Sequence, residues 1–356
     1  MAKVVDMKNK LWETKMSMNI FEVKRLYDKW GKDRFIRETK PLVEKGEILE
    51  NFTDRDWGQL HEAVDSGTFI YLIGSRVVLK VREGYEFAKN PLEPIFKVQP
   101  SSVKKDTAIG LKGPKGLDEV KEGMNYPAKG IGELKLEYDN AKYGELVEVT
   151  WETIKFDRYN AVIKVAGEVG ENAKLKEASL AADALYDSGD TGYDGSGIYV
   201  SGHGNYSTNT LSATNLETAI STIRQFTDDS SRQIVPIVKY LCVPEELRFA
   251  ALKIVKSTLE AGIAEHNYNV LKDEGLQVIS IPWWTDDDGW VLVAVGPGGT
   301  SRGYVKNEVL PLEIYTKKGQ MSSEGAWFRD IECSWKCRLY CNYHCEDYRY
   351  GYRGKP

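Results

Sequence analysis

The chain has 356 residues and is 42% hydrophobic, which is enough for a sizeable core and excludes a globally disordered protein. A formal net charge of −5 argues against a protein whose main task is gripping nucleic acid, and five cysteines exclude a disulfide scaffold and favour a reducing cytoplasm. No apolar run approaches the roughly 20 residues of a membrane span, and the N-terminal stretch lacks the apolar core of a secretory signal.

The N-terminal region contains one helical and one strand pattern. Residues 1–50 are charged and mixed, but one stretch places apolar side chains at helical spacing and predicts an amphipathic arm that needs a surface to lie on. Residues 68–82, TFIYLIGSRVVLKVR, predict a β-strand. The apolar positions of the arm are Ile20, Val23, Leu26, Tyr27 and Trp30.

Residues 93–151 have the pattern of a long hairpin. Between Lys97 and Gly132 there are six glycines, seven lysines and no helical stripe, and the stretch that follows alternates apolar with polar residues. We therefore predict two long strands joined by a polar Gly/Lys tip that protrudes from the protein. Because a lone two-stranded hairpin is marginally stable in water, we expect a neighbouring subunit to cover it.

A long helix is predicted next, with Asp157 as its N-cap. Gly167 and Gly170 weaken this helix without ending it, and the Gly/Ser/Asp-rich residues 187–210 predict a loop after it. The apolar stripe of the helix comprises Tyr159, Val162, Ile163, Ala166, Val169, Ala173, Leu180, Ala181 and Ala184.

A second unit begins at about residue 212 and mixes helices with strands. NLETAISTIRQF predicts a helix, QIVPIVKYLCV a strand, and PEELRFAALKIVKSTL a helix with Pro244 in its first turn. GLQVISIP and GWVLVAV predict strands on either side of a turn, and LPLEIYT predicts another strand near the C-terminus.

The last strand is predicted from residues that alternate with a period of two. One side carries Trp335, Leu339, Tyr343 and the four cysteines, and the other side is mostly polar and includes His344. Successive cysteines on a strand lie roughly 13 Å apart, whereas a tetrahedral zinc holds its sulfurs at about 2.3 Å. We therefore interpret the cysteines as small hydrophobes on a buried face. They are Cys333, Cys337, Cys341 and Cys345.

Other motifs have plain explanations. Residues 187–197, DSGDTGYDGSG, have the composition of a calcium-binding loop but not the spacing of its ligands. We interpret them as a solvated connector. The terminal YRYGYRGKP mixes Arg with Tyr as single-strand binders do, but we interpret it as a surface strand end. Asp286, Asp287 and Asp288 read as a charged turn between two strands. The histidines are scattered, at His61, His203, His266 and His344. We therefore expect no catalytic, cofactor-binding or metal-ligating residue, and no enzyme.

Three stretches together resemble a known family. EGMNYPAKGIGELKLEYDNAKYGELVEVTWETIKFDRYNAVIKVAGEVGENAKLKEASLAADAL looks like an extended loop running into a spine helix. KYLCVPEELRFAALKIVKSTLEAG with ISIPWWTDDDGWVLVAV is similar to an axial-domain core, and WKCRLYCNYHCEDYRYGYRG looks like a closing peripheral strand. Their order resembles the major capsid protein of tailed bacteriophages, of the Hong Kong ninety-seven-type shell fold, Mu-like branch.

The resemblance implies an α+β fold with an N-terminal arm, an extended β-hairpin loop, a peripheral domain with a long spine helix, and an axial α/β domain. The segments it implies are an arm at 1–50, peripheral parts at 51–92, 152–211 and 309–356, the extended loop at 93–151, and the axial domain at 212–308.

The resemblance also implies a function. Pentamers and hexamers of the chain would tile an icosahedral virion shell around double-stranded DNA, assembled in the host cytoplasm with a portal, a separate scaffolding protein and a possible decoration protein. DNA would be contacted non-specifically on the inner face, and no membrane would be involved. Some relatives crosslink a loop lysine to an asparagine of a neighbour. We do not predict crosslinking here, although Lys104, Lys105, Lys112 and Lys115 lie near the expected tip.

Three alternatives stay open at this stage. The first is an encapsulin-like bacterial nanocompartment shell protein, which shares the fold but encloses enzymes. The second is a metal-binding or redox protein that uses the cysteine cluster. The third is a nucleic-acid-binding module built on the Arg/Tyr tail.

Overall fold

A computed structural model describes residues 20–31, 66–112, 132–150, 152–153, 159–186, 191–228, 231–258, 268–296, 302–318 and 328–356. These residues divide between two compact units. The first unit draws on Met1–Lys89, Tyr143–Leu175 and Leu312–Leu339, and the second on Asn90–Lys142, Lys176–Pro311 and Tyr340–Pro356. The six-part division expected from the resemblance stays a prediction. Within the described ranges, no helix is both long and apolar enough to cross a membrane.

The first unit contains helices α2 (Ile20–Trp30), α5 (Ser66–Phe87) and the first part of α7 (Tyr159–Tyr186). The predicted helices at α2 and α7 are confirmed, while Asp157 lies outside the described residues. The predicted strand at 68–82 is wrong, because this segment lies within the 22-residue helix α5. A short apolar run does not distinguish a strand from a buried helix, and here the fully buried Val77 and Val81 lie one helical turn apart.

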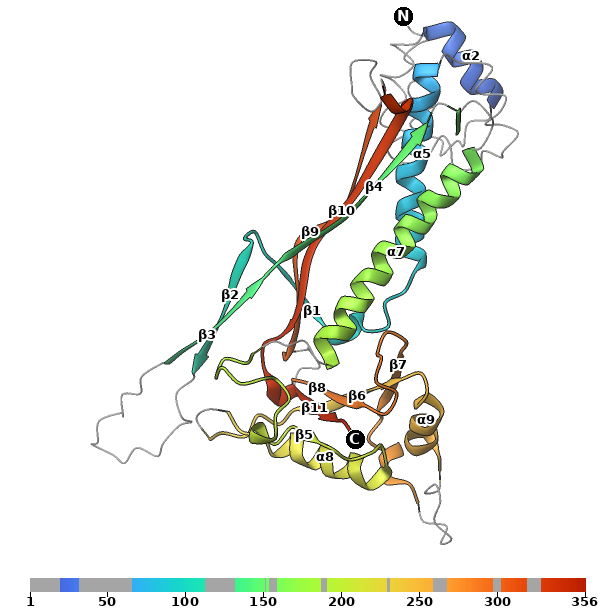
Figure 1. Ribbon diagram of the computed structural model, residues 1–356. Coiled ribbons are helices and arrows are strands. Elements are labelled where there is room, and N and C mark those ends of the chain that lie inside the picture. Colours follow the sequence, from blue (N-terminus) through green and yellow to red (C-terminus); the bar gives the residue numbers. More distant parts are fainter. Residues whose placement is uncertain are drawn as a thin grey trace, which may run out of the picture. The chain divides into compact units, whose positions relative to one another are not determined.

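Helices α5 and α7 cross closely in the first unit, where Figure 1 draws them side by side. A Cβ added to Gly84 of α5 would lie 2.2 Å from the carbonyl oxygen of Gly167 in α7. One turn further along α7, a Cβ on Gly170 would lie 2.0 Å from the carbonyl oxygen of Val81. Gly84 and Gly170 therefore allow the two helix backbones to touch, which a residue with a Cβ would prevent. The sequence pattern had suggested only that Gly170 weakens its helix.

A four-stranded sheet has the order β1-β9-β10-β4, and its two long strands contribute residues to both units. The predicted cysteine strand is confirmed as β10, whose alternate side chains from Cys333 to Cys345 are buried. The bounds are β1 (Lys97–Pro100), β9 (Tyr304–Lys318), β10 (Ile331–Cys345) and β4 (Ala141–Thr150), with the 3₁₀ turn η1 (Glu93–Ile95) before β1.

The predicted hairpin is present as β2 (Lys105–Lys112) and β3 (Gly132–Asp139), which pair antiparallel in a sheet of their own. Residues 113–131, at its tip, lie outside the described residues. The expected single second strand is broken at Asn140, after which β4 joins the four-stranded sheet. The Asn140 side chain donates to the carbonyl of Val103 at 2.8 Å, and its backbone N–H donates to the carbonyl of Lys104, so it closes the base of the hairpin.

The second unit is built on a five-stranded sheet of order β5-β11-β8-β6-β7, with α8 along it in Figure 1. Helices α8 and α9 share one core with β6 and β8. The helices and strands predicted here are confirmed, except that Pro244 ends β6 and α9 begins only at Arg248. The bounds are η2 (Ser201–His203), β5 (Tyr206–Ser207), α8 (Ala213–Gln225), β6 (Ile237–Pro244), α9 (Arg248–Lys256), η3 (Val270–Lys272), β7 (Gln277–Ile281), β8 (Trp290–Val295), η4 (Tyr348–Tyr350) and β11 (Gly351–Gly354).

The C-terminal segment forms an inner strand of this sheet. The interpretation of this segment as a surface strand end is wrong, because β11 lies between β5 and β8 and all four of its residues are buried. Two glycines make the insertion possible. A Cβ on Gly351 would lie 2.1 Å from the Tyr304 hydroxyl, and one on Gly354 would lie 2.2 Å from the Trp290 ring. With glycine at these two positions, the backbone of β11 lies closer to the Tyr304 and Trp290 side chains than it could with any larger residue there.

Candidate functional site

The hairpin β2–β3 has one charged face. Lys105 Nζ lies 2.7 Å from Glu137 Oε2, and Lys135 Nζ lies 2.5 Å from Glu137 Oε1. The hydrogen bond from Lys105, followed by that from Lys135, lowers the pKa of Glu137 to about 2, and the same carboxylate raises the pKa of Lys105. All three side chains are exposed, so this face is a charged surface that responds to salt.

The opposite face of the hairpin is mixed, with Ala108, Leu136 and Tyr138 beside Asp106. Ala108 is the cross-strand partner of Leu136, and Asp106 is the partner of Tyr138. The Tyr138 ring is 9% exposed and stacks on His344 with the ring centroids 3.9 Å apart, and burial raises the pKa of its hydroxyl. The hairpin is therefore anchored at its base through Tyr138.

His344 has a different environment from the one its strand pattern predicts. It falls on the polar side of β10, yet it is only 2% exposed. Its ring lies under Tyr138, and its Nε2 lies 3.5 Å from Glu346 Oε1. The prediction of a wet face is therefore wrong at this position, because the hairpin, which is distant in sequence, covers it.

A buried ion cluster fixes α7 to β9 within the second unit. Lys306 Nζ donates to Glu177 Oε1 at 3.0 Å and to Glu308 Oε1 at 3.1 Å. Burial lowers the pKa of Lys306, but the two carboxylates outweigh this effect and raise it overall. Glu177 is 1% exposed, so its contact with Lys306 is an ion pair shielded from water. No sequence pattern indicated the contact between Lys306 and Glu177, which lie 129 residues apart.

The cysteines are all free and buried, as the interpretation of β10 required. Burial raises the pKa of Cys337 to about 11 and that of Cys341 to about 12, so these thiols stay protonated and unreactive. Within the part of the chain that the structure describes, no three His, Cys, Asp or Glu side chains are grouped as metal ligands.

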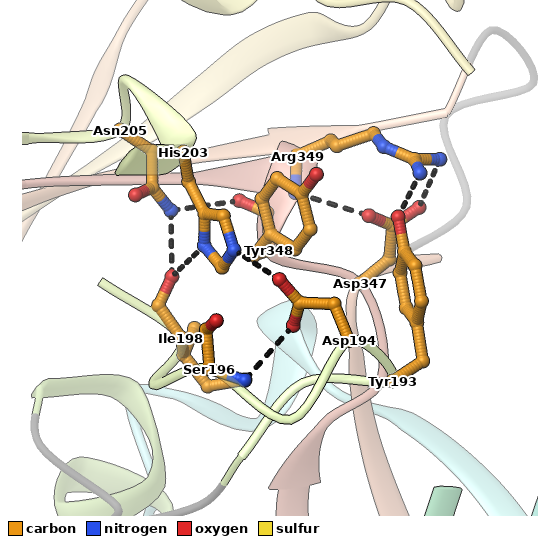
Figure 2. A network of polar contacts seen from close by, with 9 residues as sticks. All are labelled: Tyr193, Asp194, Ser196, Ile198, His203, Asn205, Asp347, Tyr348 and Arg349. Carbon is orange, nitrogen blue, oxygen red and sulfur yellow. Dashed lines mark hydrogen bonds and ion pairs between the residues drawn. The ribbon is translucent and has the colours of Figure 1, made fainter. Parts of the chain in front are cut away.

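Figure 2 shows a polar cluster that joins the loop 191–205 to the C-terminal segment. His203 stacks on Tyr348 with centroids 3.8 Å apart, and its Nε2 lies 2.7 Å from Asp194 Oδ2. The Asn205 side chain donates to the carbonyls of Ile198 and Tyr348 at 2.9 and 3.2 Å. We call His203, Asp194, Asn205 and Tyr348 the C-terminal latch. It was missed in the sequence because its members are 154 residues apart at most and have no common motif.

The Arg349 end of the cluster extends this latch. Its guanidinium contacts the Tyr193 hydroxyl and lies over the Tyr193 and Tyr348 rings at 5.3 and 5.4 Å. Asp347 accepts from the Arg349 backbone N–H at 3.0 Å and so caps η4.

Other residues singled out in the sequence are dispersed. Asp286 accepts from the Tyr186 hydroxyl, while Asp287 and Asp288 lie in the turn region between β7 and β8. Lys104 and Lys105 lie at the base of the hairpin, not near its tip as expected, because Lys105 is the register partner of Asp139. Lys112 ends β2. The positions of Lys115, His61 and His266 lie outside the described residues.

Comparisons with known proteins give one family assignment. The family described as phage capsid protein matches residues 133–354, which is more than half of the chain. No curated protein matches the sequence.

Among solved structures, the chain is similar to three shell proteins. The procapsid of bacteriophage JBD30 is 12% identical, with 82% of this chain and 76% of that chain covered and a TM-score of 0.45. The capsid of Myoviridae phage XM1 is 13% identical, with 74% and 90% covered and a TM-score of 0.46. The holo-SrpI encapsulin complex from Synechococcus elongatus is 10% identical, with 74% and 86% covered and a TM-score of 0.46.

These TM-scores lie below 0.5, so the assignment rests on the family match. The described elements are α+β, and hairpin, long helix, α/β unit and closing strands follow in the order expected of the Hong Kong ninety-seven-type shell fold. The chain belongs to the phage capsid protein family and is a structural protein of the virion capsid.

Proposed function

We propose that this chain is the major capsid protein of a tailed phage, whose pentamers and hexamers build an icosahedral shell around double-stranded DNA. The observation that carries the proposal is the family match across residues 133–354. Apolar burial between subunits supplies the free energy of assembly, and closed symmetry sets the form of the shell. The chain's role is therefore mechanical and not catalytic.

The hairpin supports this proposal as a subunit-contacting element. Strands β2 and β3 pair only with each other among the described strands, and a two-stranded sheet is marginal in water by itself. Its exposed charged face, with Lys105, Lys135 and Glu137, suits a polar surface of a second copy. We assign the hairpin to the contact with a neighbouring subunit in the shell.

The remaining partners follow from the same function. A portal, a separate scaffolding protein and a possible decoration protein would join the chain during assembly in the host cytoplasm. The net charge of −5 suits an inner wall that contacts packaged DNA non-specifically and releases it readily.

Electron microscopy of the full chain, expressed alone and with a candidate scaffolding protein, tests this proposal. We expect closed shells with fivefold and sixfold clusters of subunits, and nuclease-protected DNA in particles from the native source. A chain that stays monomeric at high concentration under both conditions would contradict the proposal. Particles that contain a protein cargo and no DNA would instead assign the chain to the bacterial nanocompartments.

A further inference from the structure

The base of the hairpin covers two buried polar side chains of the four-stranded sheet. Asn307 of β9 is fully buried, and among the described residues neither its Oδ1 nor its Nδ2 has a hydrogen-bond partner. His344 of β10 is 2% exposed, and the part of the chain that the structure describes supplies no hydrogen bond to either ring nitrogen. Glu346 Oε1 lies 3.5 Å from His344 Nε2, which is an ion-pair distance without hydrogen-bond geometry. The amide of Asn307 and the imidazole of His344 therefore both have unused hydrogen-bonding capacity.

The two side chains point to the same face of the sheet. Strands β9 and β10 are neighbours, and Lys306 Nζ of β9 lies over the Tyr343 ring of β10, 5.8 Å from its centroid, so Lys306 and Tyr343 share one face. Asn307 and His344 are the next residues of these two strands, and successive side chains of a strand point to opposite faces. Asn307 and His344 therefore lie together on the other face, which the hairpin covers.

Tyr138 closes this region from the side of the hairpin. Its ring stacks on His344 with the centroids 3.9 Å apart. Burial raises the pKa of the Tyr138 hydroxyl, whereas the Asn307 amide acts to lower it, so the hydroxyl lies beside this amide. Their contact does not meet hydrogen-bond geometry. Asn307, His344 and Tyr138 thus surround one small polar region that is shielded from bulk water.

The unused donors and acceptors define what this region can bind. The amide offers two N–H donors and a carbonyl acceptor, and a neutral imidazole offers one donor and one acceptor. Buried groups of this kind are costly without partners, and proteins commonly satisfy them with an internal water that makes about three hydrogen bonds.

The surroundings oppose a charged ligand. The carboxylates of Asp106 and Glu346 act on the Tyr138 hydroxyl, and they would repel an anion bound beside it. Within the described ranges, no three His, Cys, Asp or Glu side chains are grouped to hold a metal ion. A small neutral molecule that both donates and accepts hydrogen bonds fits these conditions.

We propose that Asn307, His344 and Tyr138 bind an internal water molecule that links the hairpin to the four-stranded sheet. Asn307 and His344 each form a hydrogen bond with the water, and the Tyr138 hydroxyl is its third partner. The water connects β3 with β9 and β10, which belong to different sheets. This inference does not depend on shell assembly, because every group in it belongs to one chain.

A density map of the purified full chain is the direct test, at a resolution that shows ordered water elsewhere in the protein interior. We expect a peak about 2.7–3.2 Å from an amide atom of Asn307 and from a ring nitrogen of His344. No peak there at that resolution, or a direct hydrogen bond from Asn307 to Tyr138 or His344, would overturn the proposal.

Stability measurements test whether Asn307 and His344 share one ligand. Asn307→Leu and His344→Phe keep the approximate size of each side chain, and the second keeps a ring for Tyr138 to stack on. Each should raise the unfolding equilibrium constant about five- to thirtyfold, because it removes one partner and leaves buried polar groups unsatisfied. The double substitution should raise it by clearly less than the product of the two single effects, since the shared water is lost only once.

Ser221→Ala is the matched control, because Ser221 is exposed on α8 and its effect should simply multiply with that of His344→Phe. If the effects of Asn307→Leu and His344→Phe also multiply, the two side chains share no ligand and the proposal is wrong. Unchanged stability in Asn307→Leu would contradict it equally. The map of the unsubstituted chain decides the question even where a variant does not fold.

Discussion

At the scale of single residues, the sharpest feature is the buried cluster of Lys306, Glu177 and Glu308. One lysine serves two carboxylates, and Glu177 has almost no contact with water. Such a pair contributes little net stability when it is intact, but its disruption is costly because a buried charge is left alone.

Lys306→Met should therefore destabilise the protein by about 3–5 kcal/mol, because it breaks the ion pair of the buried Glu177 carboxylate with Lys306. Urea unfolding followed by tryptophan fluorescence measures this change. Glu308→Gln is the matched control, because Glu308 is 30% exposed and its loss leaves the Lys306–Glu177 contact in place. Equal losses of unfolding free energy in Lys306→Met and Glu308→Gln would contradict the prediction, because they would show that breaking the Lys306–Glu177 contact costs no more than losing Glu308.

At the scale of elements, the crossing of α5 and α7 depends on glycine at particular positions. The contact at Gly84 is with backbone, which cannot move aside as a flexible side chain can. Gly167 is different, since a Cβ there would have nothing within 4 Å. Gly84 and Gly167 face each other across the helix crossing. A methyl group on Gly84 would clash with backbone, whereas one on Gly167 would meet open space.

Gly84→Ala should lower the free energy of unfolding by about 1–3 kcal/mol, since the added methyl group forces the helices apart. Gly167→Ala should leave stability unchanged or raise it by up to about 1 kcal/mol, because alanine favours a helix and meets open space. Thermal unfolding of the two variants side by side measures the difference. Equal destabilisation by both substitutions would contradict the close crossing.

The charged face of the hairpin gives a prediction in acid. The pKa of Glu137 is about 2 in the folded hairpin and 4.5 ordinarily, so folding favours its ionised form. Its contribution is therefore fully present above about pH 4.5 and is lost as the pH falls toward about 2.

Exchange protection of the β2–β3 backbone amides, measured at about pH 5 and about pH 3, follows this loss. We expect protection to fall in wild type, after correction for intrinsic exchange, and to change less in Glu137→Gln, which has no carboxylate to protonate. Identical profiles for the two proteins would show that the lysine contacts do not hold the hairpin.

At the scale of the whole molecule, the second unit closes only when the end of the chain is in place. Strand β11 separates β5 from β8, and Tyr350 and Tyr352 belong to the core that α8 and α9 share. The sheet therefore cannot be completed from the residues before position 346 alone.

Truncation after Glu346 should prevent stable folding of the second unit, because it removes an inner strand and two buried tyrosines. Limited proteolysis should then cleave within β6–β8, which the intact chain protects. Deletion of Pro356 alone is the control and should leave the digestion pattern unchanged, because this residue is exposed and follows the strand. Full resistance of the truncated chain would contradict the central role of β11.

The sequence allowed correct prediction of those helices and strands that bury one face, because their apolar residues repeat at a regular spacing. The alternation in β10, the stripe of α7 and the paired strands of the hairpin were all readable, because burial on one side imposes a period of 2 or about 3.6. Helix α5 was misread because its apolar run has no clear period. His344 was misread because its partner, Tyr138, comes from a distant segment.

By itself, the sequence determined the α+β class, the order of most elements, the buried role of the cysteines and the resemblance to a capsid protein. Only the tertiary structure decided which segments meet: His203 with Tyr348, Lys306 with Glu177, and β11 between β5 and β8. The physical reason is that a sequence pattern is local, whereas these contacts join segments that are far apart in the sequence. Periodicity records which side of an element is buried, whereas a contact between segments more than a hundred residues apart depends on how the whole chain packs.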